Sequence, residues 1–413
     1  MRKVLRSTSL NWSEWKISSK GFQSRKQACL LLRGSRQRLP LSWSDRAFAQ
    51  RLCREVTVWK KYLDHVIDIY SSRPVEKLDQ DVVRSLRIGA VQLLILKTPA
   101  HAAVSATVEA HEKHRSRGFV NAVLRKLASH TDKKDLPLHI RYSHPEKLTE
   151  RWIRLFGAER TEKLLQWNNS VPDLGGYAFG VLPAGSSPGR YLSSYRILKR
   201  DGSVEPEKGF YIQDEAAAIA AEGMAELPGK QVLEIGAAPG GKTAHLDRNG
   251  MVFSIDLKPD RLARWNENRV RLKWKNSMAA AADFGRLPFA CRFDKVIVDA
   301  PCTNTGVYRR RADARWKWSP KLLFDLVAVQ REMLTATSRA VKPGGVLVYS
   351  TCSIDAEENQ ENLRYFHENQ SAFEKLPFPA PKELTDTDGN LSFFPPESGI
   401  DGIFAAAWKK VKE

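Results

Sequence analysis

The chain has 413 residues, of which 42% are hydrophobic and 9% aromatic, enough apolar material for two or three ordinary buried cores. It holds no run of about 18 uninterrupted apolar residues, so we do not expect it to span a membrane. Its five cysteines form no C-x-x-C pair and no metal-ligand spacing with the nine histidines. This usage excludes a disulfide framework or a zinc site and indicates a reducing compartment, the cytoplasm.

Positive charge is concentrated in the first third of the chain. The formal net charge is +19, and residues 1–140 hold 27 Lys and Arg against 12 acidic residues. Trp12, Trp15 and Tyr62 are interleaved with these cations. RNA or DNA is therefore the expected partner, although a solubilising basic surface would have the same composition. We interpret residues 1–22 as a basic N-terminal arm, with an organellar transit peptide as the alternative.

Helical periodicity runs from about residue 24 to residue 128. Apolar residues recur at three- and four-residue spacings in QACLLLRGSRQ, SWSDRAFAQRLCREVTVWKKYLDHVIDIY, LDQDVVRSLRIGAVQLLILK and HAAVSATVEAHEKH. Ser42 is a good N-cap candidate, and Thr98-Pro99 separates two helices. These features predict an all-α domain over residues 23–138.

A connecting region over residues 139–205 follows, with helical spacing in SHPEKLTERWIRLFG and ERTEKLLQWNN and a loop at PAGSSPGRYLSS. Over residues 206–413, short β-branched runs alternate with helical segments. The expected strands are QVLEI (231–235), MVFSID (251–256), FDKVIVDA (293–300) and GVLVYST (345–351). This alternation predicts an α/β domain with a doubly wound, mostly parallel sheet, and GIDGIFAAAWKK should add a last strand near its edge.

Residues 234–243, EIGAAPGGKT, follow the first strand and are compatible with two functions. Gly236 and Gly241-Lys242-Thr243 satisfy the phosphate-loop pattern G-x-x-x-x-G-K-[ST], and Asp299 at the end of VIVD could then hold Mg²⁺. That alternative predicts a nucleotide hydrolase but gives no role to the cysteines downstream. A loop of the same composition can instead receive the methionine end of S-adenosylmethionine.

Polar residues follow the predicted strands at their carboxyl ends, where open parallel sheets bind ligands. Asp256 ends the second strand and can accept both ribose hydroxyls of an adenosine cofactor, or cap the helix that starts near Pro259. Asp283 lies where a third strand should end and suits the adenine edge. Cys302 and Cys352 follow the fourth and fifth strands.

Two cysteines beside such acids indicate chemistry on a base, although a single cysteine is more often a small core residue. A thiolate can add to C6 of a cytosine, which makes C5 nucleophilic enough to take a methyl group from a sulfonium. A base then removes the C5 proton and the thiolate leaves. This route needs a cysteine that ionises readily and an acid that holds the N3/N4 edge of the ring.

The cysteine motifs DAPCTNTGVYRRRADARW (299–316) and STCSIDAEENQ (350–360) strongly resemble those of the Sun/Nop-type RNA cytosine-C5 methyltransferases. AAPGGKT, SIDLKPDRL, QDEAAA and DGIF also fall in that family's order, so the resemblance covers about residues 140–413. HAAVSATVEAHEK and GFVNAVLRKL resemble the NusB-type RNA-binding domain of the family's RsmB (Fmu/Sun) branch. The resemblance implies an all-α NusB-like domain before a Rossmann-like methyltransferase domain.

The resemblance also implies roles for individual residues. Cys352 should be the nucleophile, and Cys302 should assist release of the methylated base. Asp299 should contact the cofactor and face the cytosine. The cofactor, S-adenosyl-L-methionine, should also be bound by Gly236, Ala237, Ala238, Pro239, Gly240, Gly241, Lys242, Asp256 and Asp283.

The loop after the first cysteine motif contains Arg309, Arg310 and Arg315, which suit phosphate or base contacts. The chain departs from the family pattern at Gly236, where a cysteine is usual, and at Ala312, where a proline is usual. LGGYAFGV lacks the usual arginine, and no histidine precedes DGIF.

The sequence therefore predicts an S-adenosylmethionine-dependent methyltransferase that acts on C5 of a cytosine in RNA. Family grounds point to small-subunit ribosomal RNA, and we also expect a monomer that needs no metal. The target cytosine must leave its stack, because C6 is inaccessible there. A non-catalytic RNA-binding or assembly factor and a DNA methyltransferase are the alternatives; the intact cysteines and acids disfavour the first, and the STCS motif disfavours the second.

Overall fold

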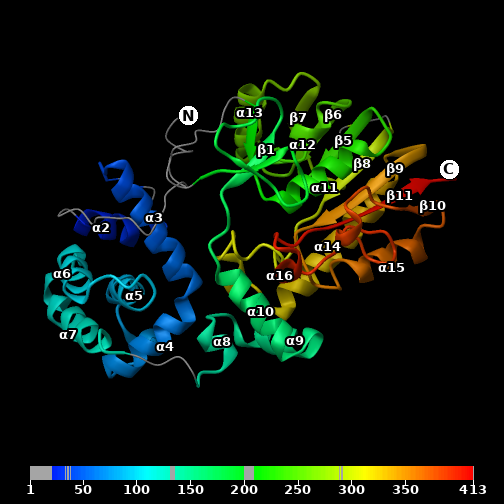
Figure 1. Ribbon diagram of the computed structural model, residues 1–413. Helices are drawn as coiled ribbons and strands as arrows, with labels where there is room; N and C mark the ends of the chain where they lie inside the picture. Colours follow the sequence, from blue (N-terminus) through cyan, green and yellow to red (C-terminus); the bar gives the residue numbers. More distant parts are fainter. Residues whose placement is uncertain are drawn as a thin grey trace. The chain divides into compact units, whose positions relative to one another are not determined.

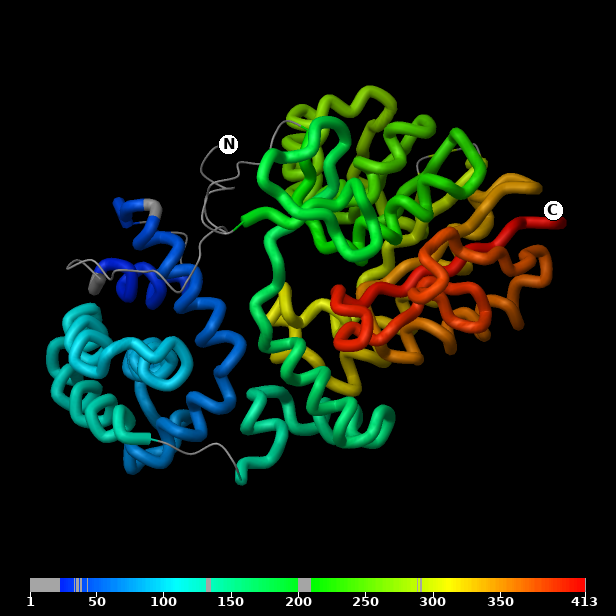
Figure 2. The backbone as a smooth tube through the Cα atoms, in the orientation of Figure 1, coloured from blue at the N-terminus to red at the C-terminus, as the bar shows by residue number. Residues whose placement is uncertain are grey.

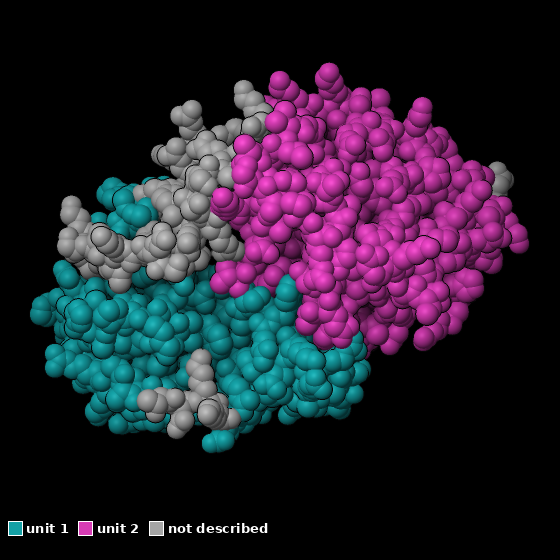
Figure 3. Space-filling view, viewed as in Figure 1, with its two compact units in different colours: residues 1–170, 200–202 teal, residues 171–199, 203–413 magenta. Residues whose placement is uncertain are grey.

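The computed structural model describes residues 21–32, 34, 37, 39–130, 135–199, 209–287, 289 and 292–412. Contacts divide the chain into two compact units, coloured separately in Figure 3. The first unit comprises residues 1–170 and 200–202, and the second comprises residues 171–199 and 203–413. Most of the predicted N-terminal arm lies outside the described residues. The domain limits at 138/139 and 205/206 stay predictions.

The first unit is helical in its described part, as the sequence predicts. Its longer helices are α2 (Gly21–Leu32), α3 (Trp43–Val58), α4 (Lys60–Ser71), α5 (Gln80–Leu94), α6 (Ala100–Ala110), α7 (Arg117–Leu127), α9 (Glu146–Phe156) and α10 (Ala158–Asn169), and the short α8 (Leu138–Arg141) precedes α9. The Ser42 side chain caps α3 by accepting the Asp45 N–H at 3.1 Å. Pro99 stands between α5 and α6, at the predicted break.

The helices from α2 through α7 share one apolar core. Leu63, Val66 and Ile67 on α4 are fully buried and share this core with Leu86 on α5 and Leu124 on α7. Their three- and four-residue spacing puts them on one face of each helix, as the helical periodicity of the sequence predicts. Among the described residues, no helix is long and apolar enough to cross a membrane.

The second unit opens with a small antiparallel sheet that the sequence did not predict. It contains β1 (Gly175–Ala178), β2 (Ser187–Pro188), β3 (Tyr195–Ile197) and β4 (Phe210–Ile212) in the order β2-β3-β1-β4. These strands have two to four residues, and β1 begins with two glycines. Such segments lack the β-branched runs by which strands are recognised in a sequence.

The main sheet has seven strands in the order β10-β11-β9-β8-β5-β6-β7 (Figure 1). They are β5 (Gln231–Ile235), β6 (Met251–Asp256), β7 (Ser277–Ala281), β8 (Phe293–Asp299), β9 (Val341–Thr351), β10 (Phe373–Leu376) and β11 (Phe404–Lys410). The five strands β5 to β9 are parallel, and β11 runs antiparallel between β9 and β10. Figure 2 shows this last strand as the red C-terminal segment. The predicted parallel sheet with a late strand near the edge is confirmed.

Helices cover both faces of the main sheet. Alternate strand residues pack on α11 (Glu215–Glu226) in one core, with Val232 and Val348 as members. The intervening residues, such as Leu233 and Leu347, pack on α14 (Pro320–Ser338) and α15 (Gln360–Asn369) in the other. The short helix α12 (Thr243–Leu246) follows β5, and α13 (Pro259–Leu272) follows β6. This is a doubly wound arrangement.

Candidate active site

The parallel strands bring the predicted site residues to one edge of the main sheet. In the hydrogen-bonded register, Ile235 pairs with both Ile255 and Val298, and Asp299 pairs with Ser350. The residues after these pairs leave the sheet at its carboxyl-terminal edge, where open α/β sheets bind ligands. The glycine-rich loop, two of the predicted acids and both cysteines follow such strand ends.

The glycine-rich loop has a backbone that only glycine fits at two positions. Gly236 has φ +79°, and a Cβ there would lie 2.4 Å from the carbonyl oxygen of Asp299. Gly240 has φ +101°, and its Cβ would lie 2.5 Å from the Trp274 ring. The Gly236 N–H donates to the Ile255 carbonyl at 2.9 Å. The loop is therefore packed tightly on its neighbours and carries no side chain where it turns, which fits a ligand that approaches the backbone closely.

Asp256 places a buried carboxylate at the end of β6. It accepts the backbone N–H of Ala238 at 3.3 Å and of Lys258 at 3.2 Å, and Arg261 pairs with it at 3.1 Å. A carboxylate has about four acceptor sites, so with the two N–H groups in place two ribose hydroxyls could bind it where they displace Arg261, whose side chain is half exposed. Leu257 beside it is 65% exposed and offers an apolar contact for a nucleoside ring.

Asp283 lies two residues beyond the end of β7 and is exposed. Asp256 pairs with Ala281 in the β6–β7 register, so both acids leave the sheet at the same edge. The Oδ1 atom of Asp283 accepts the Gly285 N–H at 2.8 Å, and its second carboxylate oxygen remains available to a ligand.

Lys242 forms an ion pair with Asp299. Its Nζ lies 2.7 Å from Oδ2, and the Asp299 side chain is 35% exposed. The Ser350 hydroxyl donates to the other carboxylate oxygen at 3.2 Å. A phosphate loop would need Lys242 for phosphates and Asp299 for Mg²⁺. In this structure the two charges neutralise each other.

Glu234 is a buried acid beneath the glycine-rich loop. Its Oε2 accepts the hydroxyls of Thr243 at 2.6 Å and Ser254 at 2.8 Å, and the Trp265 indole N–H donates to Thr243 at 2.9 Å. Burial raises the pKa of Glu234 to about 7, although both hydroxyls oppose the shift. Glu234 thus fixes the start of α12 against β5 and β6.

Cys302 and Cys352 lie side by side after β8 and β9. Their sulfur atoms are 3.1 Å apart, and the backbone N–H of Cys352 donates to the Cys302 sulfur at 3.3 Å. The Cys352 thiol also lies 3.3 Å from the amide oxygen of Asn304. Hydrogen bonding to Cys352, burial and the negative charge of Glu358 raise the pKa of the Cys302 thiol well above its usual value. Cys302 is therefore held as a neutral thiol.

A buried polar network supports the two cysteine loops. The carboxylate of Glu358 accepts the Thr303 N–H at 2.9 Å and the Gln330 amide at 2.9 Å. Asp355 lies 3.1 Å from the Thr303 hydroxyl and 3.3 Å from that of Thr305. These bonds join the loop after β8 to the loop after β9, so the two cysteines are fixed relative to each other.

The three arginines predicted to contact phosphates or bases do not stand free at the surface. Arg309 and Arg315 are buried, so the prediction is wrong for both in this structure. Arg309 donates to the Asp401 carboxylate at 2.9 Å. The Arg310 guanidinium lies 2.8 Å from the Asp401 carboxylate and 2.6 Å from that of Asp214. The pairs connect the loop after Cys302 to the DGIF segment and to the start of α11, which is a structural role.

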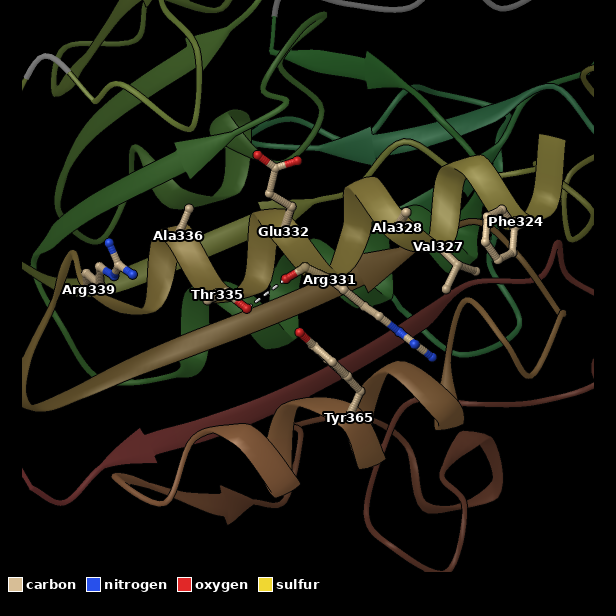
Figure 4. Close-up of a pocket in the computed structure, with 9 residues that line it drawn as sticks. All are labelled: Phe324, Val327, Ala328, Arg331, Glu332, Thr335, Ala336, Arg339 and Tyr365. Carbon is tan, nitrogen blue, oxygen red and sulfur yellow. Dashed lines mark hydrogen bonds between the residues drawn. The ribbon is translucent and has the colours of Figure 1, made fainter. Parts of the chain in front are cut away.

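A separate surface pocket of about 580 Å³ lies on α14 and α15 (Figure 4). Its lining includes Phe324, Arg331, Arg339 and Tyr365, and none of the predicted site residues. Among the described residues, no group of three or more His, Cys, Asp or Glu could hold a metal ion.

The structure thus brings together the predicted loop, acids and cysteines. Sequence reasoning missed Asn304, Asp355 and Glu358, which hold the cysteine loops. The density of Asn, Thr and acidic residues in TNTG and SIDAEEN was the available signal, but polar residues of this kind are also typical of exposed turns.

Two family models match the chain. The one described as 16S rRNA methyltransferase RsmB/F matches residues 223–409, and the NusB family matches residues 11–129. The ribosomal RNA small subunit methyltransferase B of Erwinia tasmaniensis is 30% identical over 404 residues, which cover 89% of this chain and 91% of that protein. The probable ribosomal RNA small subunit methyltransferase B of Synechocystis is 28% identical and covers 91% and 93%.

Solved structures share the fold. The crystal structure of PH0851 matches with a TM-score of 0.81 at 21% identity and covers 96% of this chain and 100% of that one. The structure of NSun6 from Pyrococcus horikoshii with SFG matches with a TM-score of 0.55 at 19% identity and covers 65% of this chain and 99% of that one. The predicted order, an all-α NusB-like region followed by an α/β methyltransferase sheet, is confirmed.

Proposed function

This chain belongs to the RsmB/F family of S-adenosylmethionine-dependent rRNA cytosine methyltransferases, and we propose that it methylates C5 of a cytosine in small-subunit 16S rRNA. The observation that carries the proposal is the pair of cysteines at adjacent strand ends, with sulfur atoms 3.1 Å apart. With two thiols this close, one can add to C6 of a base while the other assists its release.

Cys352 acts as the nucleophile in this proposal. It gives up its thiol proton to a base and adds to C6 of the cytosine, so that electron density moves to C5. S-adenosylmethionine, when bound, supplies the methyl group that C5 takes up. A base then removes the C5 proton, the electrons of that C–H bond restore the aromatic ring, and the Cys352 sulfur leaves C6 as a thiolate.

Cys302 assists the release of the methylated base. It stays a neutral thiol in this proposal, because its pKa is raised by hydrogen bonding to Cys352 and by burial. A neutral thiol 3.1 Å away can donate a hydrogen bond to the Cys352 sulfur as that sulfur regains its negative charge. In this proposal Asp299 holds the N3/N4 edge of the ring, and the contacts of Lys242 and Ser350 with its carboxylate support that role.

The glycine-rich loop and the acids at the sheet edge fit the cofactor. Residues 236–242 would contact its methionine end, the Asp256 carboxylate its ribose hydroxyls and Asp283 its adenine edge. The proposal puts the Lys242–Asp299 pair where the cofactor and cytosine sites meet.

The basic helical unit would hold the RNA. It matches the NusB family, and residues 1–140 carry 27 Lys and Arg against 12 acids. The proposal includes a target base that is unstacked when it reaches Cys352. We further propose a cytoplasmic monomer that uses no metal, since the thiols supply the nucleophile.

Bisulfite mapping of 16S rRNA from cells with and without the protein tests this function. We expect one or more cytosines to lose protection in the deletion strain and to regain it with the wild-type gene but not with Cys352→Ala. An unchanged bisulfite pattern in the deletion strain would refute the rRNA substrate. Restoration by Cys352→Ala would refute the nucleophile.

A further inference from the structure

Asn304 bridges the two catalytic loops through its side-chain amide. Its backbone has φ +62°, a left-handed conformation that Asn adopts more readily than most residues. The Nδ2 group donates to the Cys302 carbonyl oxygen at 2.7 Å. Oδ1 accepts from the Cys352 thiol at 3.3 Å. Asn304 has no part in the reaction as described above.

The Cys302 carbonyl fixes which end of the amide faces Cys352. A backbone carbonyl only accepts hydrogen bonds, so the amide must turn its N–H toward it and its oxygen toward the thiol. An acceptor bound to S–H stabilises the neutral thiol and disfavours the thiolate. The backbone N–H of Cys352, meanwhile, is directed to the Cys302 sulfur at 3.3 Å.

We propose that Asn304 is a positioning residue that holds Cys352 as a protonated, oriented thiol until the cytosine arrives. The proposal rests on the proposed role of Cys352 as the nucleophile. When Cys352 gives up its proton to a base, the amide oxygen loses its donor, and the Cys302 thiol at 3.1 Å becomes the hydrogen-bond donor to the thiolate. Ionisation of the nucleophile is thus coupled to release from Asn304.

Two substitutions separate this role from simple support of the loop. Asn304→Gly removes the acceptor and tolerates the positive φ. Asn304→Asp keeps the shape, also tolerates the positive φ, and puts a negative charge beside the sulfur. Iodoacetamide alkylation of Cys352 and Cys302, resolved by peptide mass spectrometry without RNA or cofactor, reports the thiolate fraction of each cysteine across pH.

We expect Asn304→Gly to speed alkylation of Cys352 at pH 7 by about three- to tenfold, the range of one neutral hydrogen bond. Asn304→Asp should slow the same reaction. A loop disturbance would change both rates in the same direction, and that result, or an unchanged rate in Asn304→Gly, would overturn the proposal. If Asn304→Gly does not fold, slowing in Asn304→Asp with an unchanged melting temperature supports the proposal, and no slowing refutes it.

The alkylation assay does not depend on methyl transfer. If Cys352→Ala retained methylation, the proposed nucleophile would be wrong, while the effect of Asn304 on the Cys352 thiol would still be measurable. The two failures are therefore distinguishable.

Discussion

The sulfur atoms of Cys302 and Cys352 lie 3.1 Å apart, although fifty residues separate them in the chain. The proximity follows from the parallel pairing of β8 with β9, in which Asp299 lies opposite Ser350. Each cysteine stands a few residues beyond this pair. The Glu358 network then holds both loops in place.

Replacement of Cys302 should trap the reaction after the bond to the base has formed. We expect Cys302→Ala to accumulate a covalent protein–RNA adduct, because the assisted release of Cys352 is slowed. A shifted band in denaturing electrophoresis with labelled RNA and cofactor measures the adduct. The double variant Cys302→Ala/Cys352→Ala is the control and should form none. An adduct that survives loss of Cys352 would show that the two roles are reversed.

The Asp256 carboxylate should account for much of the cofactor affinity. Hydrogen bonds to a charged group contribute about 1.5–3 kcal/mol, so Asp256→Asn should raise the dissociation constant for S-adenosylhomocysteine by about ten- to a hundredfold. Titration calorimetry measures the change. Asp260→Asn, an exposed acid on the adjacent helix, is the matched control and should bind normally. Equal affinities for Asp256→Asn and wild type would exclude Asp256 as a ribose ligand.

Glu234 should make folding stability fall as the pH rises. Burial raises its pKa from 4.5 to about 7, so between these values the folded state binds more protons than the unfolded state. The unfolding free energy therefore decreases through this window, by up to about 3 kcal/mol, and stays lower above it. The unfolding free energy of Glu234→Gln, measured in urea, should therefore fall less between pH 5 and pH 9 than that of the wild type.

The same substitution at Glu159 controls for the loss of an acid. Glu159 is exposed on α10, and Lys163 lowers its pKa, so it titrates below the window between pH 5 and pH 9. We expect Glu159→Gln to keep the wild-type difference in unfolding free energy. A Glu234→Gln variant with the full wild-type difference would mean that this carboxylate ionises normally.

Loss of Arg310 should destabilise the second unit. Its guanidinium pairs with Asp401 at 2.8 Å and Asp214 at 2.6 Å, and burial together with Asp214 raises the pKa of Asp401 to about 6. Removing one partner from a buried ion cluster costs about 3–5 kcal/mol. Arg310→Ala should therefore lower the unfolding free energy by about this amount.

Lys317→Ala is the matched control for that cluster. Lys317 pairs with Asp313 at 2.9 Å, but both side chains are more than 60% exposed. Such pairs contribute between about 0 and 1 kcal/mol. Similar denaturation midpoints for Arg310→Ala and Lys317→Ala would show that the buried cluster contributes no more than a surface pair.

Much of the fold and of the candidate site could be predicted from the sequence, because the signals are local. The strands at residues 231–235 and 251–256 match their predicted bounds, since apolar β-branched runs pack on both faces of a parallel sheet. The short strands β1 and β3 were missed because they carry no such run. Their pairing depends on neighbours elsewhere in the chain.

The sequence by itself determined which residues stand at the strand ends: the glycine-rich loop, Asp256, Asp299, Cys302 and Cys352. Only the tertiary structure decided what those residues touch. It turned Lys242 to Asp299, buried Arg309 against Asp401 and set Asn304 between the cysteines. The physical reason is that hydrogen bonds and ion pairs act over about 3 Å, and strand register brings residues fifty or ninety positions apart within that distance.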